Sequence, residues 1–130
     1  MNRPGRNEPL VTVGRIGAAD GLFVHYEGPG LIRIGFDHWG KGGPTSDPVP
    51  IVNGAYQILD VEFGTGSWGH PDGGKIQVSL NGRSVLLESL DFFPADPKEV
   101  VIGKNPVGLS TSDPDFTGEI FPTEDVNAER

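Results

Sequence analysis

The fold class is decided by Lys75-Ile-Gln-Val-Ser-Leu-Asn-Gly-Arg-Ser-Val-Leu-Leu87, where an alternating apolar pattern meets Asn81-Gly82 and a second apolar run follows. Asn and Gly tolerate the positive φ that both central residues of a tight hairpin turn require, so Asn-Gly between two such runs is a strong hairpin signal. Two short apolar pieces follow, Val100-Val-Ile-Gly-Lys-Asn-Pro106 and Phe116-Thr-Gly-Glu-Ile120. This order predicts a β-hairpin and two further strands.

The rest of the chain also consists of short apolar stretches separated by turn residues. Strands are expected at Leu10–Val13, Leu22–Tyr26, Leu31–Phe36, Ala55–Phe63, Glu99–Ile102 and Phe116–Pro122. Stretches rich in Gly and Pro predict loops at 27–30, 40–50 and 64–74, and a short helical turn is expected near 88–91. Because about eight short strands are joined by local turns, we expect an all-β fold with antiparallel sheets, as a β-sandwich or jelly roll.

Length and composition indicate a single domain. The 130 residues correspond to about one domain, which we place at 10–122, with polar, flexible tails at 1–9 and 123–130. Cysteine is absent, so the chain has no disulfide and no thiolate metal site.

The net charge limits the classes of partner that the chain can bind. A net charge of −8 repels nucleic acid and anionic membranes, and no apolar run is long enough to span a bilayer. The N-terminus lacks the apolar segment of a signal peptide, so the chain is either not exported or a domain of a larger polypeptide.

Three segments carry a family resemblance: Ile76-Gln-Val-Ser-Leu-Asn-Gly-Arg83, Val101-Ile-Gly-Lys-Asn-Pro106 and Phe116-Thr-Gly-Glu-Ile120. Their order resembles the late hairpin, the strand ending in glycine and the closing strand of laminin-G-like modules, within the concanavalin A-like lectin and glucanase superfamily. The resemblance covers about a third of the chain, which is short for that superfamily. It implies a β-sandwich with a recognition role and favours an extracytoplasmic location.

Asp60 and Glu62 are the candidate catalytic residues. Their spacing of two places both carboxylates on one face of a strand, about 7 Å apart, with Leu59, Val61 and Phe63 on the other face. Glycosidases use carboxylate pairs at comparable separations. Related glucanases carry a Glu-x-Asp-x-x-Glu motif, whereas this chain has the swapped pair and no third acid. The alternative is a solvated strand face.

Two Gly-rich loops carry the candidate ligand-binding residues. These are Trp39 with its neighbours Asp37 and His38 in one loop, and Trp68 with His70 in the other. Aromatic rings on loops offer flat apolar platforms on which the C–H faces of sugars can stack. The alternative is that each indole covers an open end of the core.

Metal sites are further alternatives. His38, His70, Asp37 and Asp72 would form a transition-metal site if their two loops met. Asn105, Asp113 and Asp115 could offer oxygens to calcium, which laminin-G-like modules often hold at a rim. The alternative is an acidic turn.

The sequence therefore predicts a non-catalytic recognition module with a carbohydrate ligand and no obligatory cofactor. A small glycoside hydrolase using Asp60 and Glu62 is one alternative. A structural or protein-contact domain of a larger polypeptide is the other.

Overall fold

The computed structural model describes residues 5–52, 54–63, 75–89, 97–109 and 111–121. This part of the chain forms β1 (Asn7–Arg15), β2 (Ala18–Gly28), β3 (Leu31–His38), β4 (Val49–Pro50), β5 (Leu59–Phe63), β6 (Lys75–Leu80), β7 (Arg83–Ser89), a 3-10 turn η1 (Pro97–Glu99) and β8 (Val100–Ile102). The predicted all-β class is confirmed. None of the described residues forms a helix long and apolar enough to cross a membrane.

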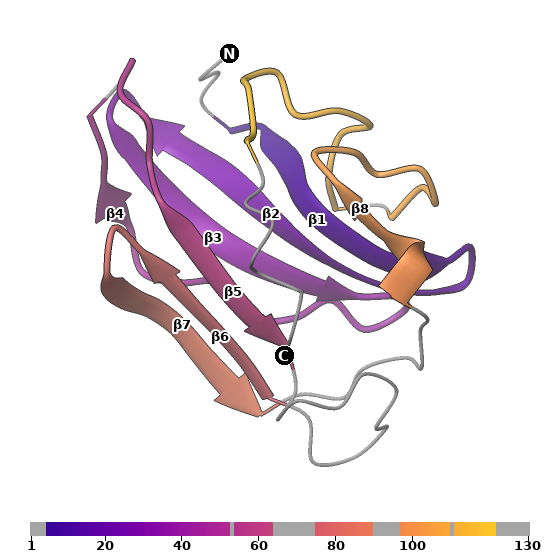
Figure 1. Cartoon of the computed structure of the whole chain (residues 1–130). Helices are drawn as coiled ribbons and strands as arrows, with labels where there is room; N and C mark the ends of the chain where they lie inside the picture. The colour runs from indigo at the N-terminus through magenta and orange to yellow at the C-terminus, as the bar shows by residue number, and fades with distance from the viewer. Residues whose placement is uncertain (1–4, 53, 64–74, 90–96, 110, 122–130) are drawn as a thin grey trace.

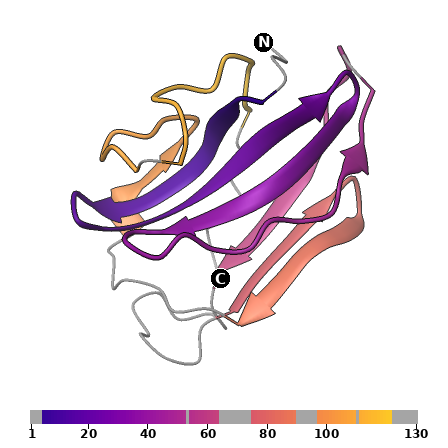
Figure 2. The ribbon, with the colours of Figure 1, turned by 180° about the vertical axis from the view of Figure 1, so that it is seen from behind.

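The strands form two antiparallel sheets. One has five strands in the order β4-β3-β2-β1-β8, and the other has three in the order β5-β6-β7. The smaller sheet lies against one face of the larger one (Figure 1). In the view from behind, the long strands β1, β2 and β3 of the larger sheet lie nearest the viewer (Figure 2).

One buried cluster joins the two sheets. The larger sheet contributes alternate residues of β2 and β3, and the smaller sheet contributes apolar residues of β6 and β7: Leu22, Val24, Tyr26, Ile32, Ile34 and Phe36, with Ile76, Val78, Leu80 and Leu86. Ile32, Ile34 and Phe36 lie on one face of β3, and all three side chains are buried. Burial of these side chains is the main stabilising contribution to the domain.

The Asn-Gly hairpin forms as predicted. Asn81 and Gly82 have φ values of 53° and 83°, and they connect β6 to β7 in antiparallel register. Asn81 is the one non-Gly residue with positive φ in the described part of the chain. Local turn chemistry is therefore sufficient to determine this element.

Several expectations about where elements begin and end are wrong. β1 begins at Asn7, so Asn7 to Pro9 are not a loose tail, and Glu8 and Pro9 are buried. β5 begins at Leu59 instead of Ala55. β7 runs through Ser89, so no helical turn starts at Glu88, because pairing of Glu88 with Ile76 on β6 overrides the local helical spacing.

The expected closing strand is also absent. Within 116–121 the backbone forms no strand, although Lys104 and Asp115 form an isolated bridge just before it. The expected loop 40–50 follows the edge of β3 through bridges at Thr45 and Gly42 and ends in β4. The expected loop 64–74 and the tail 123–130 lie outside the described residues.

Candidate functional site

The outward face of β5 carries the two predicted carboxylates. Leu59 and Val61 pack against the buried cluster, so the alternate residues Ile58, Asp60 and Glu62 face outward and are exposed. This confirms the predicted half-buried strand. The strand thus presents two exposed acidic side chains, and the exposed apolar Ile58 immediately precedes it.

The segment before β5 is fixed by the hairpin turn. The side-chain oxygen of Asn81 accepts a hydrogen bond from the Ile58 amide at 2.8 Å, and the Asn81 amide donates to the Ile58 carbonyl at 2.7 Å. The Asn81 side-chain amide also donates to Gln57 Oε1 at 2.7 Å. Since Tyr56 is the next residue along, these bonds restrain the backbone that presents its ring.

Tyr56 and Phe121 form an exposed aromatic pair. The two side chains are 78% and 67% exposed, and their ring centroids lie 5.7 Å apart at an interplanar angle of 77°. This edge-to-face arrangement is a favourable geometry for aromatic rings. It leaves large aromatic surfaces in contact with solvent, and Tyr56 lies three residues before the start of β5. We call Tyr56, Phe121, Ile58, Asp60 and Glu62 the aromatic–acidic surface.

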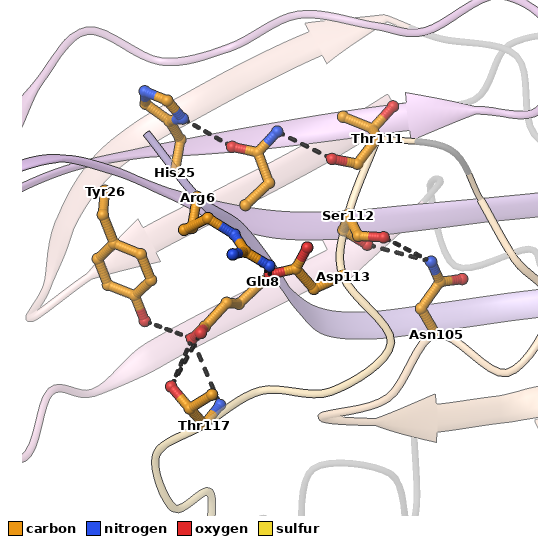
Figure 3. Close-up of polar contacts among 10 residues, drawn as sticks. Arg6, Glu8, His25, Tyr26, Asn105, Thr111, Ser112, Asp113 and Thr117 are labelled. Atoms are coloured by element: carbon orange, nitrogen blue, oxygen red, sulfur yellow. Dashed lines mark hydrogen bonds and ion pairs between the residues drawn. The ribbon is translucent and has the colours of Figure 1, made fainter. Parts of the chain in front are cut away.

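Phe121 reaches this surface at the end of the segment Asp113–Phe121, which we call the strap. Asp113 at its start receives hydrogen bonds from Arg6 at 2.6 and 3.1 Å (Figure 3). Asp115 pairs with Lys104 at 2.9 Å. The Phe116 amide donates to the Gly103 carbonyl at 2.9 Å, and the Phe116 side chain packs against the buried cluster.

A buried carboxylate holds the middle of the strap. Glu8 on β1 is fully buried, and it accepts hydrogen bonds from the Tyr26 hydroxyl at 2.8 Å and from the Thr117 hydroxyl at 2.8 and 3.1 Å. The Thr117 amide adds a longer contact at 3.3 Å. Figure 3 shows these side chains converging between β1, β2 and the strap. Burial, together with the hydrogen bond and charge of Glu8, raises the pKa of Tyr26 far above its ordinary value.

The surroundings of Asp60 and Glu62 are polar and open. Across the sheet Asp60 is paired with Ser79 and Glu62 with Gln77. Among the described residues no third acidic or histidine side chain joins them to form a group of three. The two carboxylates are thus an exposed pair on a sheet face.

The predicted Trp39 loop is held to β2 by hydrogen bonds. His38 Nδ1 contacts the buried carboxylate of Asp20 at 2.5 Å, Asp37 is buried, and the Trp39 amide donates to the Ala19 carbonyl at 3.0 Å. Trp39 itself is half-buried. Trp68, His70 and Asp72 lie outside the described residues, so a meeting of the two loops stays a prediction.

The calcium candidates are engaged elsewhere. The Asn105 side chain holds its own loop, accepting from the Leu109 amide at 2.9 Å and donating to the carbonyls of Leu109 and Ser112. Asp113 is bound by Arg6, and Asp115 by Lys104. The described part of the chain brings together no group of three His, Asp or Glu that could hold a metal ion.

Tyr56 and Phe121 were not predicted as site residues, yet a signal was present. Tyr56 and Ile58 have the same parity along the chain as Asp60 and Glu62, so they are apolar residues in the row that should face solvent. Exposed apolar residues beside polar ones often mark interaction surfaces. Phe121 carried no such signal, because the course of the strap depends on contacts distant in sequence.

Comparisons with known proteins give no further identification: no protein-family model, no curated protein and no solved structure matches the chain.

Proposed function

We propose that the chain is a non-catalytic recognition module that binds carbohydrate at the aromatic–acidic surface. The observation that carries the proposal is the exposed pair of Tyr56 and Phe121, together with the exposed Asp60 and Glu62 on the strand that follows Tyr56 in the chain. Aromatic faces offer apolar area to the C–H face of a sugar ring, and carboxylate oxygens accept hydrogen bonds from its hydroxyls. The net charge of −8 favours neutral or cationic glycans over anionic ones.

We further propose a β-sandwich of the concanavalin A-like kind. Support comes from two antiparallel sheets that share one buried cluster, and from the hairpin β6–β7 followed by β8, which ends before Gly103. The strap occupies the place of the expected closing strand without pairing as one. This fold supports a recognition role by analogy only, because many functions share one fold.

A protein-contact role is the second candidate, and a specific observation favours it. Val52 and Ile58 are 70% and 66% exposed, and exposed apolar side chains near Tyr56 would also suit a protein partner. The glycoside hydrolase alternative has less support, because Asp60 and Glu62 lie on an open sheet face without a third acidic residue among the described ones. Catalytic carboxylates usually require a cleft that excludes water.

A glycan array followed by calorimetric titration tests the proposal. Wild-type protein should bind at least one class of neutral or cationic oligosaccharide, and Tyr56→Ala should abolish binding with little change in melting temperature, because the ring is mostly exposed. Trp39→Ala and Trp68→Ala test the two predicted loops in the same assay. Absence of binding across the array, or full binding by Tyr56→Ala, would contradict the assignment. Asp60→Asn and Glu62→Gln, assayed on β-glucans, test hydrolysis.

A further inference from the structure

We propose that Glu8 is a positioning residue for the aromatic–acidic surface: through Thr117 it sets the course of the strap and so holds Phe121 against Tyr56. The inference rests on the proposed function for its consequence in binding. It rests on contacts alone for its structural part.

The Glu8 carboxylate is contacted by hydrogen-bond donors. Three donors point at this carboxylate: the hydroxyl of Tyr26, the hydroxyl of Thr117 and the amide of Thr117. An ionised carboxylate is a pure acceptor with two oxygens, so it matches the three donors that contact it. A glutamine in its place would turn one acceptor into a donor. Since the site is fully buried, water is a poor substitute for a lost partner.

Two attachments to the larger sheet fix the direction of the strap. Phe116 and Thr117 are consecutive, and they bond to different parts of the larger sheet: the Phe116 amide to Gly103 just after β8, and Thr117 to Glu8 on β1. A single attachment would fix only the position of the strap, whereas two consecutive attachments also fix its direction. The strap is thereby held to the β8 edge and to β1 at the same point.

Thr117 is separated from the aromatic pair by a short length of chain. Phe121 is four residues beyond Thr117, and a chain of that length spans at most about 14 Å when fully extended. Between them Ile120 lines a small pocket with Ile102 and Phe116. Fixing Thr117 therefore restricts the space that the Phe121 ring can reach, and Tyr56 lies within it.

Two matched variants of Thr117 test the inference. Thr117→Val preserves the shape and removes the hydroxyl, whereas Thr117→Ser keeps the hydroxyl. We expect the nuclear Overhauser contacts between the Tyr56 and Phe121 rings to be lost in Thr117→Val and kept in Thr117→Ser. Arg6→Gln removes the ion pair at the start of the strap, and it should preserve the ring contacts even where it lowers the melting temperature.

Binding of cellohexaose, laminarihexaose and chitohexaose is measured on the same proteins. If the wild type binds one of them, Thr117→Val should weaken that binding at least tenfold and Thr117→Ser less than threefold. Ring contacts that survive in Thr117→Val, or that vanish equally in Thr117→Ser, overturn the inference. Should Thr117→Val fail to fold, Glu8→Gln decides by the same ring contacts. If the wild type binds no probe, the ring contacts alone still decide, and only the proposed function is weakened.

Discussion

The hydroxyl of Tyr26 donates to the fully buried carboxylate of Glu8, and this bond ties the stability of the domain to the protonation of one phenol. Burial is the largest cause of the raised pKa of Tyr26, and the hydrogen bond and the charge of Glu8 add to it. Ionisation would put a second negative charge beside a buried carboxylate. The folded protein therefore retains the Tyr26 proton at a pH where the unfolded chain has lost it.

The first prediction concerns alkaline pH. Because the pKa is higher in the folded state, the contribution of Tyr26 to the free energy of unfolding should be constant below about pH 10 and fall as the pH rises above it. The chain has two tyrosines, so Tyr56→Phe leaves Tyr26 as the sole phenol. Its tyrosinate absorbance should develop well above pH 10.0, together with unfolding. A reversible titration centred at or below that value would contradict the Glu8–Tyr26 interaction.

The second prediction concerns Gly35 on β3. A Cβ atom at this position would lie 2.3 Å from the ring of Phe23, which crosses it from β2. Gly35→Ala should therefore lower the free energy of unfolding by about 1–3 kcal/mol, as overpacking does. Gly28→Ala is the control, because nothing lies within 4 Å of its Cβ position. Equal urea midpoints for the two variants would refute the close packing of Phe23 on Gly35.

At the scale of the elements, local and non-local determinants differ in what a sequence reveals. The β6–β7 hairpin was predictable, because Asn81-Gly82 specifies its own turn. The start of β1 was not predictable, because a glutamate is usually a surface residue. Only the folded structure brings Tyr26 and Thr117 into contact with Glu8. The segment Phe116–Pro122 was predicted as a strand, because hydropathy cannot show that Phe116 bonds to Gly103 whereas Thr117 bonds to Glu8 on β1.

The third prediction separates the two roles of Asn81. Asn81→Gly keeps a backbone that accepts positive φ, and it keeps the backbone bond to the Ile58 carbonyl, but it loses the side-chain bonds to the Ile58 amide and Gln57, which should cost about 1 kcal/mol. Asn81→Ala loses those bonds and is also strained in the left-handed region, so it should cost about 1–2 kcal/mol more. Urea midpoints measure both. A smaller loss for Ala than for Gly would show that the turn does not require positive φ.

At the scale of the whole molecule, the larger sheet extends beyond the smaller one. The five-stranded sheet places β1 and β8 beside the strap, whose Phe116 packs against the shared cluster (Figure 1). Alternating apolar residues were enough to predict antiparallel sheets. They could not predict which strands pair, nor that a segment near residue 121 meets residue 56, because such contacts depend on the complete fold. The carboxylates of the site were therefore predictable from spacing, whereas the aromatic pair was not.

The most direct test of carbohydrate recognition is a two-dimensional amide NMR titration of the wild-type domain with an oligosaccharide selected on the glycan array. We expect saturable shifts at Tyr56, Ile58, Asp60 and Phe121, which contribute to the aromatic–acidic surface, and their loss in Tyr56→Ala. Shifts confined to the loops of Trp39 and Trp68, or no shifts with any oligosaccharide, would contradict this expectation.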